Sequence, residues 1–280
     1  MEKADVEKLL DDFLDSYSMR YRDGLSNTLT VPLLDIDSVS PDLGDALLKE
    51  PDTVFSLAKA KGYSLRIIKL YDQTPISAIR HDHIGKLISV RGIVTAMSDV
   101  HPVARTVSFE CQSCGHVIEI EQNEDPDSLM KQPLICPSCG KKGKFKIVEK
   151  KMIDVQKIVI EEEFNDTNRT SNMPVLLTEE LVNPDLISTI APGSLVEVIG
   201  ILREKEKRTF KGQKMISSSF ILYANSIRNL EETYTKISLT NEDIQKIKEF
   251  ATPDILDKLQ TMIAPEIYGY DTIKKALLLQ

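Results

Sequence analysis

The sequence predicts an α+β protein built from several units: a helical bundle, a small β-barrel with a metal-binding insertion, and a C-terminal helical segment. Three observations support this fold class. Apolar side chains recur with the period of an α-helix in residues 1–75, and short β-branched runs separated by turns fill residues 87–225. The four cysteines form two CxxC pairs inside the β-rich region. A length of 280 residues and a hydrophobic fraction of 41% suit two or three such units.

The predicted helical bundle covers residues 1–75. A second helix is expected after Ser40-Pro41-Asp42, because serine caps helices and proline suits the first turn. A third helix follows Pro51 and stops at Gly62, and residues 29–34 are expected to be extended. The first helix has an acidic face, interpreted as solvated rather than as a partner surface. Its apolar face consists of Val6, Leu9, Leu10, Phe13, Leu14 and Tyr17.

The predicted barrel takes in residues 76–110 and 145–235. The run at 87–95 is rich in β-branched residues, with Gly92 as a bend or bulge. About five or six short antiparallel strands with an elaborated connection suit an OB-type barrel, although other small barrels fit the same pattern. The further expected strands lie at 106–110, 117–120, 144–148, 152–160, 174–177, 195–202 and 218–225.

The C-terminal residues 236–280 are predicted to be helical. The segment from Ile267 to Gln280 stops in the middle of an apolar-periodic run. A natural terminus more often trails into polar residues, so the chain is interpreted as cut at the entry to a further domain.

Composition and charge constrain the class of partner. The N-terminus has no signal peptide, and no apolar run approaches the roughly 20 residues of a membrane helix, so a cytoplasmic protein without membrane contact is expected. The net charge of −8 conceals an acidic segment at residues 1–60 and two basic stretches, at 141–157 and 201–216. A polyanion responds to the local potential, so the net charge does not exclude a nucleic acid.

The two CxxC pairs predict a structural zinc site in an insertion at 111–144. Each pair sits on a tight turn followed by glycine, so both thiolates of a pair can point at one ion. Four thiolates close the coordination sphere and leave no position for a substrate, which makes the metal structural. The predicted ligands are Cys111, Cys114, Cys136 and Cys139.

The alternatives to zinc are weaker. An iron–sulfur cluster remains open, whereas disulfides need an oxidising compartment and a thioredoxin-like redox site needs only one pair on a βαβ unit. His116 could replace a cysteine, but with four thiols present it is expected to lie outside the ligand set or in solvent.

Catalysis has little support in the sequence, and no catalytic residue is predicted. The sequence contains no phosphate-binding Gly-rich loop, no Gly-x-Ser-x-Gly and no His-Glu-x-x-His motif. His81 and His83 are interpreted as part of a solvated turn.

Nucleic-acid binding has better support. A basic β-hairpin is predicted at about 201–216, with Lys211-Gly212 at its tip. Alternation places cations on one face of the outgoing strand, and more cations crowd the tip, so the ribbon can follow a phosphate backbone. The alternative is a lysine-rich edge that only keeps the hairpin soluble. The hairpin cations are Arg203, Lys205, Lys207, Arg208, Lys211 and Lys214, and Lys157 lies on another strand.

With these features in order, the chain resembles the N-terminal part of the minichromosome maintenance (MCM) replicative DNA helicases, of the archaeal type. The resemblance covers nearly the whole length. The stretches that carry it are Leu87-Ile-Ser-Val-Arg-Gly-Ile-Val, Phe109-Glu-Cys111-Gln-Ser-Cys114-Gly-His, Val155-Gln-Lys157-Ile-Val-Ile-Glu-Glu, Pro192-Gly-Ser-Leu-Val-Glu-Val-Ile-Gly-Ile-Leu-Arg and Ile267-Tyr-Gly-Tyr-Asp-Thr-Ile-Lys-Lys-Ala-Leu.

The resemblance implies a ring, a homohexamer or double hexamer, whose barrels line a channel for single- and double-stranded DNA. It implies that the hairpin cations contact DNA, that Lys157 binds single strands, and that residues 165–173 relay state to an AAA+ ATPase domain. ATP and Mg²⁺ would bind only in that domain, of which 236–280 is the entry. Other replication factors and a chromosomal location are also implied.

One departure and two rival hypotheses accompany this resemblance. The family often has a basic residue where this chain has Thr95-Ala96-Met97, so its single-strand path can differ. The rival is a zinc-ribbon and OB-fold scaffold of the transcription- or translation-factor kind that binds protein partners. A metal-dependent hydrolase is a third, poorer reading, because the thiolate site is closed.

Overall fold

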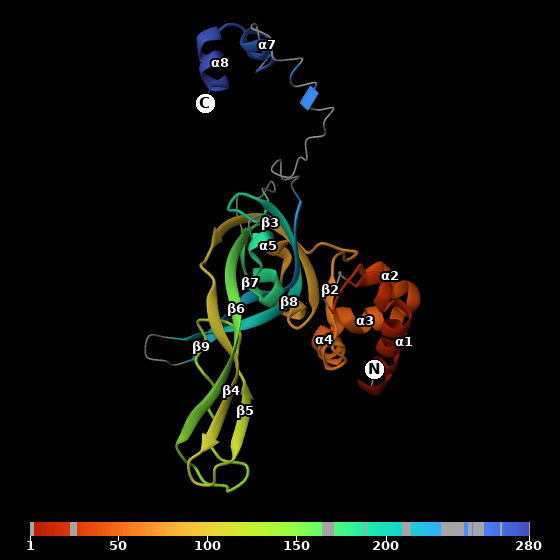
Figure 1. The fold of residues 1–280 in the computed structure, drawn as a ribbon, viewed down its shortest axis with the longest axis vertical. Helices are drawn as coiled ribbons and strands as arrows, with labels where there is room; N and C mark the ends of the chain where they lie inside the picture. The colour runs from red at the N-terminus through yellow and green to blue at the C-terminus, as the bar shows by residue number, and fades with distance from the viewer. Residues whose placement is uncertain are drawn as a thin grey trace. The chain divides into compact units, whose positions relative to one another are not determined.

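The computed structural model describes residues 3–22, 27–163, 171–187, 189–208, 214–230, 244–245, 248, 255–263 and 265–279. The chain divides into two compact units, Met1–Glu232 and Thr233–Gln280, and Figure 1 labels their elements. In the described part of the chain, no helix is both long and apolar enough to cross a membrane.

The N-terminal region of the first unit is helical and carries a small parallel sheet. Helix α3 begins where the sequence predicts, because Ser40 accepts a hydrogen bond from the Leu43 backbone N–H at 3.3 Å and Pro41 occupies the first turn. Helix α2 was not expected; it has only seven residues and no side-chain cap. The elements are α1 (Lys3–Tyr21), β1 (Thr28–Val31), α2 (Leu33–Val39), α3 (Pro41–Lys49), α4 (Pro51–Ala60) and β2 (Ser64–Ile67).

A barrel follows the helices. The sheet order is β3-β8-β9-β7-β6-β4-β5, and an additional pairing of β3 with β6 closes five of these strands into a cylinder. All neighbours are antiparallel except β7 and β9. Four short helical turns connect this part of the chain: η1 (Ile76–Ala78), η2 (His81–His83), η3 (Glu179–Val182) and α5 (Pro184–Ile187). The strands are β3 (Leu87–Met97), β4 (His101–Cys111), β5 (Val117–Glu121), β6 (Phe145–Glu161), β7 (Asn172–Thr178), β8 (Leu195–Arg208) and β9 (Lys214–Asn229).

Strands β4, β5 and the first half of β6 leave the barrel as a three-stranded extension (Figure 1). The β4–β6 ladder runs without a break from His101↔Val155 to Cys111↔Phe145, with two bulges. The predicted insertion at 111–144 therefore covers only the end of a longer projection. The outer half of β6 is exposed, whereas Ile158 and Ile160 are buried in the barrel.

The two largest apolar clusters among the described residues stabilise the first unit. The barrel core gathers alternating residues of its strands, among them Val90, Val175 and Val198, none of which is exposed to solvent. The helical core extends onto the barrel, because Ile199 and Ile201 of β8 pack with the apolar faces of the helices. Helices and barrel thus share one side of β8.

The second unit is described only in part, and its helices are α7 (Ile255–Met262) and α8 (Asp271–Leu278). Neither helix buries a side chain, and Lys275 Nζ lies 2.6 Å from Asp257 Oδ1 between them. The reading of this segment as the entry to an ATPase domain stays a prediction.

Candidate metal centre and nucleic-acid interface

The two cysteine turns have the same backbone geometry. Gly115 and Gly140 adopt φ angles of +72° and +68°, a conformation that favours glycine. Their N–H groups donate to the carbonyls of Cys111 and Cys136 at 2.8 and 2.9 Å and close the turns. Each CxxCG sequence therefore folds into a knuckle that presents both sulfurs on one side.

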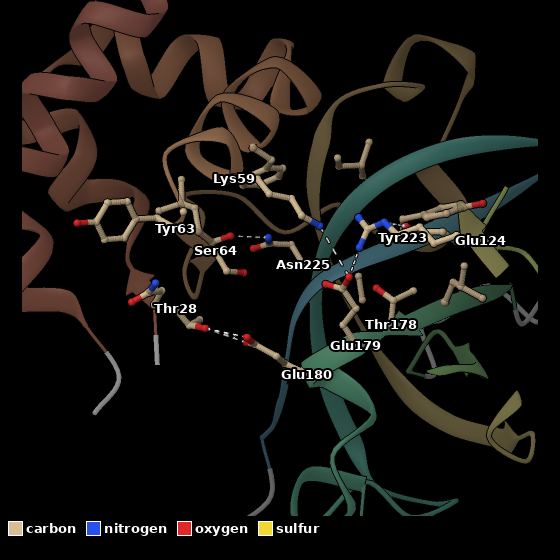
Figure 2. A pocket seen from close by; sticks show the side chains of 18 of the residues that line it. Thr28, Lys59, Tyr63, Ser64, Glu124, Thr178, Glu179, Glu180, Tyr223 and Asn225 are labelled. Carbon is tan, nitrogen blue, oxygen red and sulfur yellow. Dashed lines mark hydrogen bonds and ion pairs between the residues drawn. The ribbon is translucent and has the colours of Figure 1, made fainter. Parts of the chain in front are cut away.

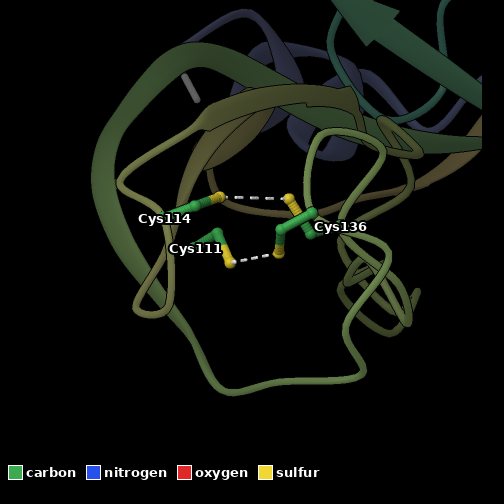
Figure 3. Close-up of side chains that lie close together, drawn as sticks. Cys111, Cys114 and Cys136 are labelled. Atoms are coloured by element: carbon green, nitrogen blue, oxygen red, sulfur yellow. Dashed lines mark hydrogen bonds between the residues drawn. The ribbon is translucent and has the colours of Figure 1, made fainter.

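The four sulfurs meet at the end of the extension (Figure 3). The Cys111–Cys139 and Cys114–Cys136 Sγ distances are 3.8 and 3.6 Å, and all four sulfurs lie within 4.8 Å of one another. A tetrahedral zinc ion with Zn–S bonds of about 2.3 Å requires sulfurs about 3.8 Å apart. The spacing fits one ion and leaves no room for the irons and sulfides of a cluster, so the predicted ligand set is brought together as expected.

The pKa values of Cys111 and Cys114 are shifted in opposite directions. The Ser113 backbone N–H lowers the pKa of Cys111 to about 7, which makes the thiolate accessible near neutral pH. The His116 backbone lowers the pKa of Cys114, but burial and the neighbouring sulfurs outweigh it and raise this pKa to about 11. The His116 side chain is exposed and lies outside the cluster, as expected.

Lys157 and Lys205 come together although they are far apart in the sequence. Lys157 Nζ, from β6, lies 2.6 Å from Asp125 Oδ1, and Lys205 Nζ, from β8, lies 2.7 Å from Asp125 Oδ2. Asp127 contacts both ammonium groups, and its Oδ2 lies 2.9 Å from Lys205 Nζ. The base of the hairpin and the middle of β6 therefore form one cationic area, which already holds two carboxylates.

These carboxylates come from the loop that joins β5 to the second cysteine turn. We call residues 122–131 the acidic loop. Lys131 N–H donates to Gln122 Oε1 at 2.7 Å and Gln122 Nε2 donates to the Lys131 carbonyl at 3.0 Å, which pinches the loop at its base. Next to this base, the Tyr223 hydroxyl donates to Asn123 Oδ1 at 2.7 Å. The loop thus folds back onto β9 and the two lysines.

The ion pairs shift the pKa values of Asp125, Asp127 and Lys205. Hydrogen bonds from Lys157 and Lys205 lower the pKa of Asp127 to about 2. Burial raises the pKa of Asp125, but the two lysines outweigh it and lower this pKa overall. Desolvation lowers the pKa of Lys205, and the carboxylates more than reverse that effect. Because the carboxyl pKa values are depressed, the ion pairs contribute above pH 4 and are lost as the pH falls toward 2.

Among the remaining predicted DNA-contacting residues, the structure describes the side chain of Arg203 but not those of the others. The Arg203 guanidinium lies 2.7 Å from Asp52 Oδ1 and stacks 5.0 Å from the Tyr223 ring centroid. The hairpin itself is present, with Arg208 opposite Lys214. The structure describes the backbone but not the side chains of Lys207, Arg208 and Lys214, and Lys211 lies outside the described residues.

A cavity of 470 Å³ lies where α4 and β2 meet the barrel (Figure 2). Glu179 faces Lys59 at 3.8 Å and is also paired with Arg105, which lies 3.4 Å from Glu124. Burial and the Arg105 charge lower the pKa of Lys59. These two cations already have carboxylate partners, and we assign the cavity no ligand.

Sequence reasoning missed the acidic loop. The segment Asn123-Glu-Asp-Pro-Asp is predicted to be a turn-rich loop, and its acidic composition was the available signal. Which cations those acids contact depends on how the extension bends back, and no local pattern encodes that.

Comparisons with known proteins agree with this geometry. Residues 75–206 match the family described as MCM OB domain. The minichromosome maintenance protein MCM of Saccharolobus solfataricus is 30% identical over 220 residues, which cover 77% of this chain and 32% of that protein. The DNA replication licensing factor MCM7 of Arabidopsis thaliana is 30% identical over 215 residues, 73% of this chain and 29% of that protein.

A solved structure resembles the fold. The 1.8 Å crystal structure of the N-terminal domain of an archaeal MCM superposes with a TM-score of 0.65 at 25% identity, covering 81% of this chain and 99% of that one. The chain spans about a third or less of the length of the relatives it matches.

Proposed function

Because this chain contains an MCM OB domain and has the fold of an archaeal MCM N-terminal domain, we propose that it is the DNA-binding and ring-forming part of a replicative, ATP-dependent DNA helicase. Its metal is a structural zinc. ATP hydrolysis and Mg²⁺ belong to an AAA+ domain, and this chain supplies the grip on single- and double-stranded DNA. Homohexamers, single or stacked, are the proposed assembly, with chromosomal DNA and other replication factors as partners.

The cationic area on one side of the barrel carries the proposal. Lys157 and Lys205 share the Asp125 carboxylate, so two strands far apart in the sequence present ammonium groups at one place. The β8–β9 ribbon continues from there with Lys207 and Arg208 on β8 and Lys214 on β9, and Lys211 lies between them in the sequence. A row of cations without a base-reading groove binds the phosphate backbone and does so in a salt-dependent way.

The proposed role depends on charge. The cations neutralise phosphates and release counterions, which holds DNA without reading its sequence. The zinc centre fixes the end of the extension, where large apolar side chains such as Leu134 and Val148 are 83% and 56% exposed. Exposed apolar side chains favour protein contacts. They support assembly of copies, and they are also the observation that favours the protein scaffold as the second candidate.

We expect charge reversal at the hairpin tip, Lys211→Glu with Lys214→Glu, to weaken binding of a labelled single-stranded oligonucleotide at least tenfold at low salt. The slope of the logarithm of the association constant against the logarithm of the salt concentration should become less steep by about 1 to 2. Fluorescence anisotropy over a salt series measures both quantities.

The matched control is Lys8→Glu with Lys69→Glu, which makes the same change in net charge at exposed lysines of the helical region. The control should bind like the parent protein. If the folded, zinc-loaded parent does not bind at low salt, the proposal fails and the scaffold function gains; if both variants weaken equally, the DNA path lies elsewhere.

A further inference from the structure

We propose that the acidic loop, residues 122–131, is an internal competitor for DNA: its carboxylates occupy the phosphate positions at Lys157 and Lys205, and DNA binding displaces the loop. The inference rests on the proposed DNA-binding function and adds regulation to it. The loop covers Lys157 and Lys205 in the free protein, and both lysines become available in the complex with DNA.

The contacts of the loop resemble those of a bound phosphate. Both oxygens of Asp125 are used, one by each lysine, at 2.6 and 2.7 Å. A second anionic oxygen, from Asp127, bridges the same two ammonium groups. A phosphodiester likewise offers anionic oxygens on one centre to two neighbouring cations. Carboxylates and phosphates therefore cannot occupy this place together.

The loop is attached by ionic and polar contacts and not by a hydrophobic core. Asp125 is the only buried side chain among residues 122–135, all of which the structure describes. The neighbouring apolar side chains Leu129 and Met130 are 68% and 41% exposed. Its other contacts on the barrel side are the Tyr223–Asn123 hydrogen bond and the Arg105–Glu124 ion pair at 3.4 Å. Opening this segment breaks these ionic and polar contacts but exposes little apolar surface, because its apolar side chains already lie partly in solvent.

Competition predicts two changes in DNA binding. The apparent affinity of the parent protein is lowered by the fraction of molecules in which the loop is closed. Its salt dependence is also shallow, because exchange of carboxylates for phosphates releases fewer counterions than binding to free lysines. Removal of the loop charges should therefore make binding both tighter and more salt-dependent.

The first test compares the parent protein with a double variant that carries both Asp125→Asn and Asp127→Asn. We expect roughly tenfold tighter binding of single-stranded DNA in low salt and a steeper salt slope. The control is Glu119→Gln with Glu149→Gln, which removes two exposed charges from the strands of the same extension. The control should stay within twofold of the parent. Asp127→Asn alone, at a side chain that is 66% exposed, tests the same direction without altering a buried group.

The second test follows the loop in the unmodified protein by hydrogen exchange. The Gln122 N–H donates to the Arg105 carbonyl of β4 at 2.8 Å, so this amide reports whether the loop is held against the strand. Saturation with single-stranded DNA should accelerate its exchange.

The outcomes separate the two proposals. If the parent binds DNA but the aspartate variants bind no tighter than the control, or if DNA protects the Gln122 amide, the competitor role is wrong and DNA binding stands. If no form of the protein binds DNA, the proposed function fails and the competitor role falls with it.

Discussion

We expect replacement of Cys136 by serine to abolish binding of the proposed zinc ion and to unfold the end of the extension, while the barrel stays folded. Cys136 is fully buried, and its sulfur lies 3.6 Å from that of Cys114. A hydroxyl is a poor zinc ligand, and structural zinc contributes about 10 kcal/mol or more to the folding of a small site. Strand β5 alternates exposed and half-buried residues, so few apolar contacts replace the metal.

Elemental analysis and hydrogen exchange measure the two parts of this prediction. Zinc should fall from one per chain to a background level, and the amides of residues 111–144 should exchange quickly while those of β3 and β8 stay protected. His116→Ala is the control, because this exposed side chain should leave the zinc content unchanged. One zinc per chain in the serine variant would show that the ligand set is wrong.

Gly200→Ala is expected to destabilise the first unit by about 3 kcal/mol. Gly200 lies on β8 at the bulge in its pairing with β9. An added Cβ would lie 2.3 Å from the Tyr223 carbonyl oxygen and 3.0 Å from Ala224 Cα. These are backbone atoms inside a closed barrel, so no side-chain rotation can relieve the clash.

Urea denaturation measures the loss of stability as a lower midpoint at an unchanged slope. Gly143→Ala serves as the comparison, because the nearest atom to its added Cβ is 3.9 Å away. A midpoint for Gly200→Ala equal to that of the comparison variant would mean that β8 and β9 are not packed as described.

Local patterns predict much of this fold. The turn after each CxxC pair needs a glycine with positive φ, and the sequence supplies Gly115 and Gly140. Ser40 and Pro41 mark the start of α3, and the β-branched run at 87–95 becomes the greater part of β3. Each of these features depends on residues a few positions apart, so it can be read from the chain.

Long-range geometry could not be predicted in the same way. Strands β4 and β6 continue past the barrel because they pair over ten residue pairs despite two bulges, a property of the pairing and not of either strand alone. The resemblance predicts that Lys157 and Lys205 contact DNA, but nothing in the local sequence predicts that both pair with Asp125 and Asp127. Charge patterns identify cations; only the tertiary structure identifies their partners.

The central claim is that DNA lies along the cationic area of the barrel and the hairpin. Photo-crosslinking of the complete chain to a single-stranded oligonucleotide that carries 4-thiothymidine, followed by peptide mapping, tests this claim most directly. The account predicts cross-linked peptides that contain residues 155–161 and 203–216, with higher yields in the variant that combines Asp125→Asn and Asp127→Asn. Crosslinks confined to the helical residues 3–60 would contradict it.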